Sequence, residues 1–473
     1  MMKILLILAF LIPVLVVNVS IARFIKKMRS PFKQIGWSIQ SLVFLGSVGL
    51  YATFILNQED IRGMFIFIVT SAVISIIYSI HAMELLARKW RKPFNWLTPL
   101  IFTLVTFGGF FFSLMTTRRW NELRENNPDL LDFAIGLFFT LMAVCITVAI
   151  FQILQDLTWL TTLRKKEKRP KSLLGEPMDR STFITKLGMI AGGMVLGSFA
   201  WGLTRGKFGF RVMEQDVYSF NLPAEFDGLT IVQISDLHLG SFNRNFDPII
   251  EAVQIINSLE PDIICFTGDL VNTYHTEALD WVPIIKDLSA KERKFSILGN
   301  HDYGYYGDTT EEQQEECRAG VIEMNKAMDF DILVNEHRIL QRGNAKLCVV
   351  GVENWGESKW FPKNGDMVEA TKGMESVDFT LLLSHDPTHW DAKVVKQENI
   401  DLTLSGHTHG AQMGLRIPGI LEISPAQLMF KRWAGLYQEG EQQLYINRGM
   451  GYLMMPGRVG MPPEITKITL RKA

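Results

Sequence analysis

Five short blocks of the sequence carry side chains that bind metal ions and exchange protons. They are Ser235-Asp236-Leu237-His238, Gly268-Asp269, Gly299-Asn300-His301-Asp302, Ser384-His385-Asp386 and Gly406-His407-Thr408-His409-Gly410. Five of the nine histidines of the chain lie in these blocks. Carboxylate, amide and imidazole groups are ligands of divalent metals, and an imidazole also exchanges a proton near neutral pH. The residue types therefore indicate metal-dependent chemistry.

Each block follows a short apolar run, and we interpret these runs as buried strands. The predicted strands are Leu229–Ile234, Ile263–Phe266, Phe295–Leu298, Leu347–Val352, Phe379–Leu383 and Leu402–Leu404. Between the first two, apolar residues recur at helical spacing from Ile249 to Leu259. Strands that alternate with helices predict a layered α/β domain of about 250 residues. Because strand ends at one edge of a sheet lie close together, the blocks are expected to form one pocket.

Each block on its own has an ordinary explanation. A D-x-H or a G-D pair occurs by chance, a single histidine is more often structural, and H-x-H suits an ordinary strand end. The five blocks, however, all follow apolar runs, and each contains a glycine or serine that lets the backbone turn tightly. Their order and placement favour a shared site.

The patterns D-x-H, G-D, G-N-H-D, H and G-H-T-H resemble, in this order, the signature of the calcineurin-like metallophosphoesterases. The resemblance covers residues 221–470. Phe226–Ile231, Tyr445–Gly449 and Pro462–Ile465 are similar to the membrane-anchored bacterial branch of that superfamily. The resemblance implies a metallophosphoesterase-type α/β sandwich, built of βαβ units in four layers.

The resemblance also implies a dinuclear metal centre. One metal ion would be held by Asp236, His238, Asp269 and His409, and the other by Asp269, Asn300, His385 and His407. These mixed ligands suit Mn²⁺, Fe or Zn²⁺ better than Mg²⁺ or Ca²⁺. Two such ions about 3.5–4 Å apart would activate a bridging water for in-line attack on phosphorus. His301, which binds neither ion in the family, would be the general acid that protonates the leaving oxygen.

Three positions depart from the family pattern. Asn272 stands where protein phosphatases of the superfamily have the aspartate that orients the catalytic histidine. His301 is therefore expected to be less strongly protonated, or to be oriented by another group such as Asp302, and a phosphoprotein substrate is disfavoured. Ala411 replaces a glycine that usually follows the last block, and Ser181 replaces the second arginine of a twin-arginine export pattern.

The first 207 residues differ from the rest in charge and hydropathy. They contain 24 Lys and Arg against 11 Asp and Glu, whereas residues 208–473 contain 24 against 38. A bilayer core about 30 Å thick requires about 20 apolar residues per helix. Six stretches meet this requirement: Ile4–Ile21, Ile35–Leu56, Met64–Leu86, Trp96–Met115, Leu131–Leu154 and Leu187–Leu203.

The distribution of basic loops predicts the orientation. Lys and Arg cluster at residues 23–33, 88–92 and 164–171, after the first, third and fifth spans, and such loops stay in the cytoplasm. With six spans, the following domain would be periplasmic or extracellular in a multi-pass protein of the cell (inner) membrane; a miscount by one span would reverse this. The predicted organisation is residues 1–160 with helices one to five, 161–207 with a basic cytoplasmic loop and helix six, and 208–473 with the phosphoesterase domain.

Sequence and resemblance together predict a membrane-anchored, dinuclear metal-dependent phosphoesterase. Its expected partners are the lipid bilayer and a phosphomonoester or phosphodiester, with a lipid or lipid-linked phosphate suggested by the membrane tether; no nucleic acid is expected. One alternative is a UDP-diacylglucosamine-type pyrophosphohydrolase at the cytoplasmic face. Another is a transporter or sensor with a regulatory metal-binding domain, although the complete set of site residues argues against an inactive domain.

Overall fold

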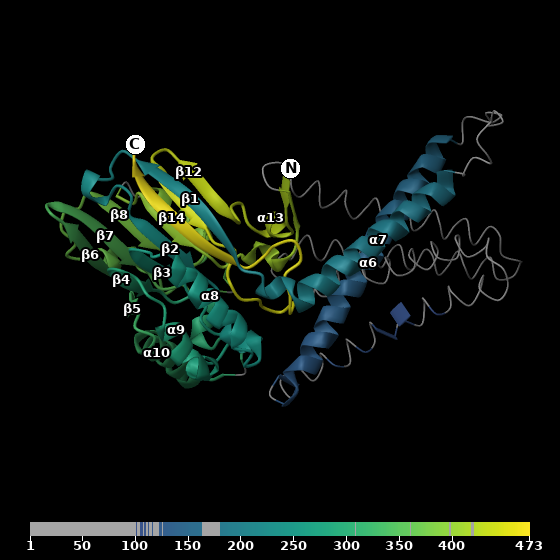
Figure 1. Cartoon of the computed structure of the whole chain (residues 1–473), viewed down its shortest axis with the longest axis horizontal. Coiled ribbons are helices and arrows are strands. Elements are labelled where there is room, and N and C mark those ends of the chain that lie inside the picture. Colours follow the sequence, from purple (N-terminus) through teal and green to yellow (C-terminus); the bar gives the residue numbers. More distant parts are fainter. Residues whose placement is uncertain are drawn as a thin grey trace, which may run out of the picture. The chain divides into compact units, whose positions relative to one another are not determined.

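The computed structural model describes residues 126–162 and 180–473, except 308, 360, 397, 398 and 418–420, together with scattered residues between 101 and 124 (Figure 1). The chain divides into two compact units, Met1–Ala200 and Trp201–Ala473. We describe each unit by itself.

Two long apolar helices are described in the first 207 residues. They are α6 (Pro128–Thr162) and α7 (Arg180–Thr204). Within them, Pro128–Gln152 and Thr182–Thr204 are the segments, among the described residues, that are long and apolar enough to cross a bilayer. They correspond to the predicted fifth and sixth spans. The first three predicted spans and most of the fourth lie outside the described residues, so the total of six stays a prediction.

The second unit is built on two six-stranded mixed sheets. The strand order of the first sheet is β1 (Arg211–Ser219), β14 (Glu464–Lys472), β2 (Thr230–Ile234), β3 (Ile263–Phe266), β4 (Arg293–Ser296) and β5 (Asp331–Ile332). The order of the second is β12 (Gly435–Glu439), β13 (Gln442–Ile446), β9 (Leu402–Ser405), β8 (Phe379–Leu383), β7 (Ala345–Gly351) and β6 (Glu336–Arg342). Strands β10 (Leu415–Ile417) and β11 (Leu421–Ile423) form a separate antiparallel pair.

Helices and short 3-10 turns connect the strands. The helices are α8 (Asp247–Ser258), α9 (Val282–Lys286), α10 (Glu311–Ala327), α11 (Met367–Ala370), α12 (Thr388–Ala392) and α13 (Ala426–Met429). The 3-10 turns are η1 (Gly206–Phe208), η2 (Ala224–Phe226), η3 (Leu239–Phe242), η4 (His275–Trp281), η5 (Asn300–Tyr303), η6 (Val394–Lys396) and η7 (His409–Gln412).

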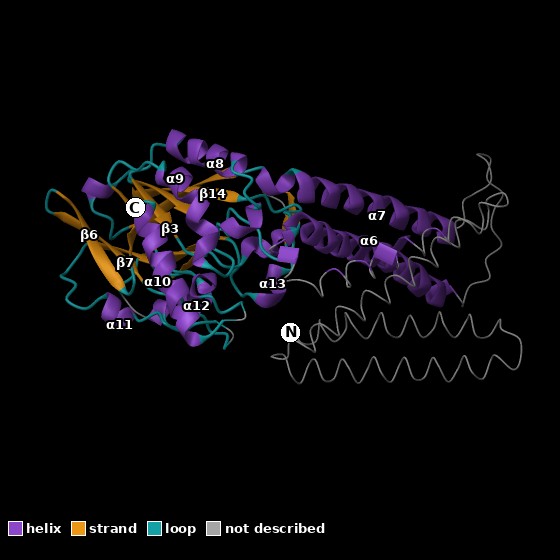
Figure 2. Cartoon of the chain, turned by 90° about the horizontal axis from the view of Figure 1, so that it is seen from below, coloured by secondary structure: helices purple, strands orange, loops and turns teal. Residues whose placement is uncertain are grey.

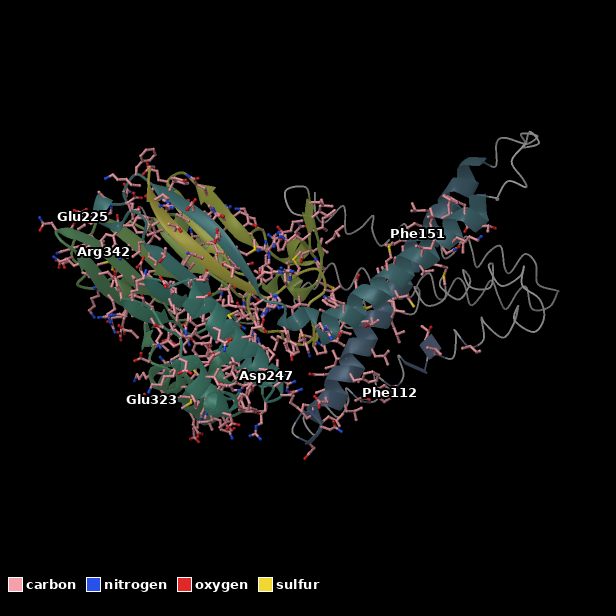
Figure 3. All side chains as sticks on the ribbon, in the orientation of Figure 1. Phe112, Phe151, Glu225, Asp247, Glu323 and Arg342 are labelled. Carbon is pink, nitrogen blue, oxygen red and sulfur yellow. The ribbon has the colours of Figure 1, made fainter. Side chains whose placement is uncertain are left out.

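Three buried clusters hold the layers together. Ile231 of β2 lies in the cluster between the sheets with residues of β8 and β9, whereas the next residue, Val232, joins the cluster that includes α8, α9 and α10. Leu382 of β8 likewise faces away from the first sheet, toward α11 and α12. Helices therefore cover both outer faces (Figure 2), and charged side chains such as Asp247 and Glu323 point outward from them (Figure 3). The predicted α/β architecture is confirmed.

The strands that precede the five blocks belong to two sheets. Strands β2, β3 and β4 lie in the first sheet, and β8 and β9 lie in the second. The sequence predicts that all five lie at the edge of one sheet, and this prediction is wrong. The convergence itself still holds, because the carboxyl ends of these parallel strands meet at one end of the sandwich, where their ligand atoms cluster.

Candidate metal centre

The structure brings together all the residues predicted to bind metal. Asp236, His238, Asp269 and His409 form one group of ligand atoms within 4.8 Å of one another, and Asp269, His385 and His407 form a second. Asn300 joins the second group, because its Oδ1 lies 3.1 Å from Nε2 of His385. Every member is buried except His407, which is half-buried. Asp269 is common to both groups.

The first group presents acceptor atoms to a shared point. Nε2 of His238 lies 3.1 Å from Nε2 of His409 and 3.5 Å from Oδ2 of Asp269, and Nε2 of His409 lies 3.2 Å from Oδ1 of Asp236. Nδ1 of His238 lies 3.2 Å from the carbonyl oxygen of Val271. A carbonyl only accepts, so Nδ1 carries the hydrogen and Nε2 offers its lone pair. Burial lowers the pKa of His238 to about 3, so the ring is neutral near pH 7, as a metal ligand must be.

The second group has the same construction. Nδ1 of His385 donates to the carbonyl oxygen of Thr267 at 2.7 Å, so Nε2 faces Oδ1 of Asn300 at 3.1 Å and Oδ2 of Asp269 at 3.2 Å. Three acceptors at such distances repel one another unless a cation or a proton lies among them. Burial opposes a charge on His385, but the Asp269 carboxylate raises its pKa to about 10. The site therefore favours positive charge here, and its residues fit a divalent metal ion.

Both histidines have the outer contact that is usual for metal-binding imidazoles. Such rings donate their second N–H to a carbonyl or a carboxylate, which fixes the tautomer and the orientation of the ring. His238 does so to Val271 and His385 to Thr267. Asp236 is fixed from a third direction, because the main-chain N–H of His407 donates to its two oxygens at 3.0 and 3.1 Å.

The backbone of the centre is held in unfavourable conformations. Five of the predicted ligands have positive φ angles, from 45° to 71°: Asp236, His238, Asp269, His407 and His409. For a residue other than glycine, the left-handed region costs about 1–2 kcal/mol. Such strain persists where the surrounding structure overrides the local preference, and it is concentrated at functional sites.

Glycines of the blocks allow the strand ends to approach one another. Gly268 has φ +92°, and a Cβ there would collide with the backbone of Gly299. A Cβ at Gly406 would collide with Ser235 and Asp236. Any larger residue at Gly268 or Gly406 would therefore push apart the loops that carry the ligands.

His301 lies beside the metal-binding groups without belonging to either. Its Nδ1 lies 2.7 Å from the main-chain oxygen of Asn272, so this nitrogen carries a hydrogen and Nε2 is at the free side of the ring. Its main-chain N–H donates to Oδ1 of Asp269 at 2.8 Å. The ring stacks on Tyr306, with centroids 4.1 Å apart, and meets His238 edge to face at 4.9 Å. This position is suited to proton transfer next to a bound metal.

Asp302 binds main-chain N–H groups of two loops and does not orient His301, although the sequence suggested that it could. Its carboxylate accepts hydrogen bonds from the main-chain N–H groups of Gly299, Asp269 and Leu270 at 2.8–2.9 Å. It thereby ties the loop after β4 to the loop after β3. Burial, with the nearby Asp269, raises the pKa of Asp302 to about 7. His301 is oriented by a main-chain carbonyl instead, which the sequence could not reveal.

Three further residues that the sequence did not predict as site residues lie at the site. The hydroxyl of Tyr306 accepts from Nδ2 of Asn300 at 2.8 Å. Nη2 of Arg458 lies 3.3 Å from Nδ1 of His409, and this arginine is only 2% exposed. The ring of Phe430 lies 5.6 Å from the ring of His407. Only Arg458 could have been noticed in the sequence, because it is the one charged residue in the stretch from Met454 to Val459.

A two-sheet sandwich with a buried aspartate, histidine and asparagine cluster at its strand ends could hold divalent metal ions that activate water for hydrolysis. Comparison with known families agrees with this chemistry. Residues 229–411 match the family "Calcineurin-like phosphoesterase", and residues 61–207 match "Probable Calcineurin-like phosphoesterase, transmembrane domain". The chain therefore carries a calcineurin-like metallophosphoesterase domain together with a transmembrane domain of the type found in these proteins, as the sequence predicted.

Several curated proteins are similar to this chain. An "Uncharacterized metallophosphoesterase YkuE" of Bacillus subtilis is 29% identical over 303 residues, which cover 62% of this chain and 98% of that protein. A "Transmembrane protein with metallophosphoesterase domain" of Danio rerio is 28% identical over 58% of this chain and 60% of its own length. An "Uncharacterized metallophosphoesterase" of Helicobacter pylori is 29% identical over 58% of this chain and 68% of that protein.

Proposed function

We propose that this membrane protein hydrolyses a phosphomonoester or a phosphodiester at a centre of two divalent metal ions. The observation that carries the proposal is that Asp269 belongs to both groups of ligand atoms. A carboxylate shared between two ligand sets is placed to bridge two ions. The donor set of carboxylate, imidazole and amide suits Mn, Fe or Zn.

The residues divide the work between binding and proton transfer. Asp236, His238 and His409 would complete one metal site with Asp269, and Asn300, His385 and His407 would complete the other. When bound, the ions would supply a polarised phosphoryl oxygen and a water molecule of lowered pKa. Arg458 packs beside His409, with Nη2 3.3 Å from Nδ1 of the ring.

His301 is proposed as the general acid. As the bond from phosphorus to the leaving oxygen breaks, a proton passes from Nε2 of His301 to that oxygen, while the other ring hydrogen stays on Nδ1, which still donates to the main-chain oxygen of Asn272. The imidazole is left neutral with the same tautomer that the structure fixes. Stacking on Tyr306 keeps the ring from rotating between these steps.

The membrane domain is proposed to have six spans and to place the phosphoesterase domain on the periplasmic or extracellular side. The family match at residues 61–207 supports part of this, because four of the six predicted spans fall within it. The bilayer and a phosphate ester are the proposed partners, and nucleic acid is not among them. Alkaline phosphatase fused after Lys207 should be active and green fluorescent protein at the same position should be dark.

The opposite reporter result would favour the first alternative, a UDP-diacylglucosamine-type pyrophosphohydrolase that works at the cytoplasmic face. The second alternative is a transporter or sensor with a regulatory metal-binding domain. Under this alternative, the membrane domain should still function in Asp269→Asn, which removes the shared carboxylate charge.

The deciding experiment is a hydrolysis assay on the full-length protein in detergent or nanodiscs. Bis-p-nitrophenyl phosphate and p-nitrophenyl phosphate would be tested with Mn²⁺, with Zn²⁺ and with a chelator. We expect metal-dependent turnover that is lost in Asp269→Asn, with Asp216→Asn as the control at an exposed carboxylate. A folded, metal-loaded protein without turnover on either ester would refute the proposal.

A further inference from the structure

The hairpin of β10 and β11 exposes an apolar face. Its register pairs Leu415 with Ile423 and Ile417 with Leu421, and all four side chains are 40–54% exposed. Side chains alternate between the faces of a strand, so these four lie on one face. The intervening pair, Arg416 and Glu422, belongs to the other face and is less exposed. An exposed strand pair normally shows the opposite pattern, with its polar residues outward.

Helix α13 extends this apolar face. Leu428 and Met429 are 58% and 74% exposed, and Nε2 of Gln427 donates to the main-chain oxygen of Glu422 at 3.2 Å. The helix and the hairpin are therefore neighbours (Figure 1). We define the apolar patch as Leu415, Ile417, Leu421, Ile423, Leu428 and Met429. Single exposed apolar residues are ordinary, but a contiguous group of this size marks an interaction surface.

The patch is joined to the end of the membrane helix α7. Within the second unit, the main-chain N–H of Arg458 donates to the oxygen of Gly202, close to the end of α7 at Thr204. The next residue, Val459, accepts from the main-chain N–H of Gly414, which directly precedes β10. Within the second unit, these two main-chain hydrogen bonds link Gly202, through Arg458 and Val459, to the residue that precedes the hairpin. The hairpin therefore lies near the last residues of a candidate membrane span, which ends at Thr204.

The patch is also joined to the metal centre. The segment from His409 leads through η7 into β10, and the hydroxyl of Ser424, just after β11, donates to the main-chain oxygen of Gly410 at 2.6 Å. Phe430, the residue after α13, packs edge to face against His407. The same segment therefore contacts both the chain near Gly202 and the predicted metal ligands.

We propose that the apolar patch inserts into the surface layer of the lipid bilayer and that the metal centre acts on phosphate esters carried by membrane lipids. The assignment of the substrate rests on the proposed phosphoesterase function, whereas the insertion does not. Apolar side chains that face water on a free domain become buried among the upper acyl chains. A lipid that stays in the bilayer then presents its phosphate to the centre without leaving the membrane.

Insertion can be measured without any activity. A bimane fluorophore would be attached at Ile423→Cys in the full-length protein, whose four native cysteines are all buried. The matched control is Val368→Cys on α11, which is 81% exposed. In nanodiscs that contain phosphatidylcholine with a doxyl group at carbon 5, we expect at least twofold stronger quenching at position 423 than at 368.

Two results would overturn insertion. Equal lipid quenching at the two positions, with access of aqueous iodide at 423, would show a hairpin that faces water. Protection from both quenchers would show that another protein surface, such as a second copy of the chain, covers the patch.

The substrate class is tested by a fourfold variant, Leu415→Ser, Ile417→Ser, Leu421→Ser and Ile423→Ser, with Val368→Ser as the control. Full-length proteins in nanodiscs would be assayed on dioleoyl phosphatidic acid, on dioleoyl phosphatidylglycerol and on soluble bis-p-nitrophenyl phosphate. We expect the fourfold variant to lose at least tenfold on a lipid that the wild type hydrolyses and to stay within about twofold on the soluble ester, which also shows that it folds.

The outcomes separate the two proposals. A wild type that hydrolyses the soluble ester but neither lipid, or a variant that loses both activities equally, would overturn the lipid assignment. A wild type inactive on all three substrates would refute the phosphoesterase function, and the quenching experiment would still decide whether the patch inserts.

Discussion

The Nδ1 atom of His301 lies 2.7 Å from the main-chain oxygen of Asn272, and no charged side chain is needed for this contact. The carbonyl is itself held in place, because the carboxylate of Glu277 accepts the main-chain N–H groups of Asn272, Thr273 and Tyr274 at 2.7–3.0 Å. The orientation of the proposed acid thus depends on a loop that the carboxylate of Glu277 fixes.

We therefore expect unequal effects from two neighbouring substitutions. Asn272→Ala keeps the carbonyl and should change kcat by less than about threefold, even though a hydrogen bond from Ser241 is lost. Glu277→Ala releases three main-chain N–H groups and should lower kcat by tenfold or more with little change in KM, because a misplaced catalytic group affects the chemical step. Steady-state kinetics on an alkyl phosphate such as glycerol 2-phosphate, whose leaving group needs the proton, would show this, and a larger effect for Asn272→Ala than for Glu277→Ala would contradict it.

The role of His301 predicts a dependence on the leaving group. An alkoxide needs a proton as it departs, whereas p-nitrophenolate leaves readily without one. His301→Ala should therefore reduce hydrolysis of an alkyl phosphate such as glycerol 2-phosphate by about 10²-fold or more, the usual contribution of a general acid. The loss with p-nitrophenyl phosphate should be clearly smaller. Equal losses with the two esters would indicate that His301 positions the substrate or a ligand instead.

Removal of the metal should lower stability as well as activity. Without a metal ion, Nε2 of His385 would carry a proton toward Asn300 and Asp269, and the binding free energy of the ion would no longer favour the folded state. A ligand present at about 100 times its Kd stabilises the folded state by about 2.7 kcal/mol. For a unit of this size, that corresponds to roughly 5–10 °C in Tm. Thermal unfolding with Mn²⁺ and with a chelator would measure the shift, which should shrink in Asp269→Asn; a shift of unchanged size in that variant would place the metal elsewhere.

Asp302→Asn should destabilise the protein by about 2 kcal/mol or more, because the amide group would turn a donor toward main-chain N–H groups that the carboxylate now accepts. Asp216→Asn is the matched control, since its ion pair with Arg471 is exposed and contributes about 0–1 kcal/mol. Denaturant unfolding followed by tryptophan fluorescence would compare the two. Equal midpoints for the two variants would show that Asp302 is not the tie between the loops after β3 and β4.

The sequence revealed the central strands because they are buried on both faces. Strand β8 (Phe379–Leu383) is an unbroken apolar run, and its predicted bounds match the structure. Strands β1 and β6 were not recognised, because β6 reads Glu-His-Arg-Ile-Leu-Gln-Arg and is polar at both ends. An edge strand with mixed burial has no clear apolar pattern.

The sequence predicted the residues of the site but not the hydrogen-bond partners that orient them. Asp236 and His409 were found because their types and spacing are informative in themselves. His301 is oriented by the main-chain carbonyl of Asn272. Because every residue has such a carbonyl, the sequence does not show which one binds the ring. Whether the seven residues bind two metals stays a prediction for the experiments above.

The pairing of the first and last strands of the domain has a consequence for biosynthesis. All nine residues of β1 pair in parallel with β14, which lies between β1 and β2 in the sheet. The strand that follows the membrane helix α7 therefore lacks its partner until the final nine-residue strand leaves the ribosome. Insertion of the preceding apolar helices can be completed while this sheet is still open. The first sheet of the domain thus closes only after the helices that precede it have been synthesised.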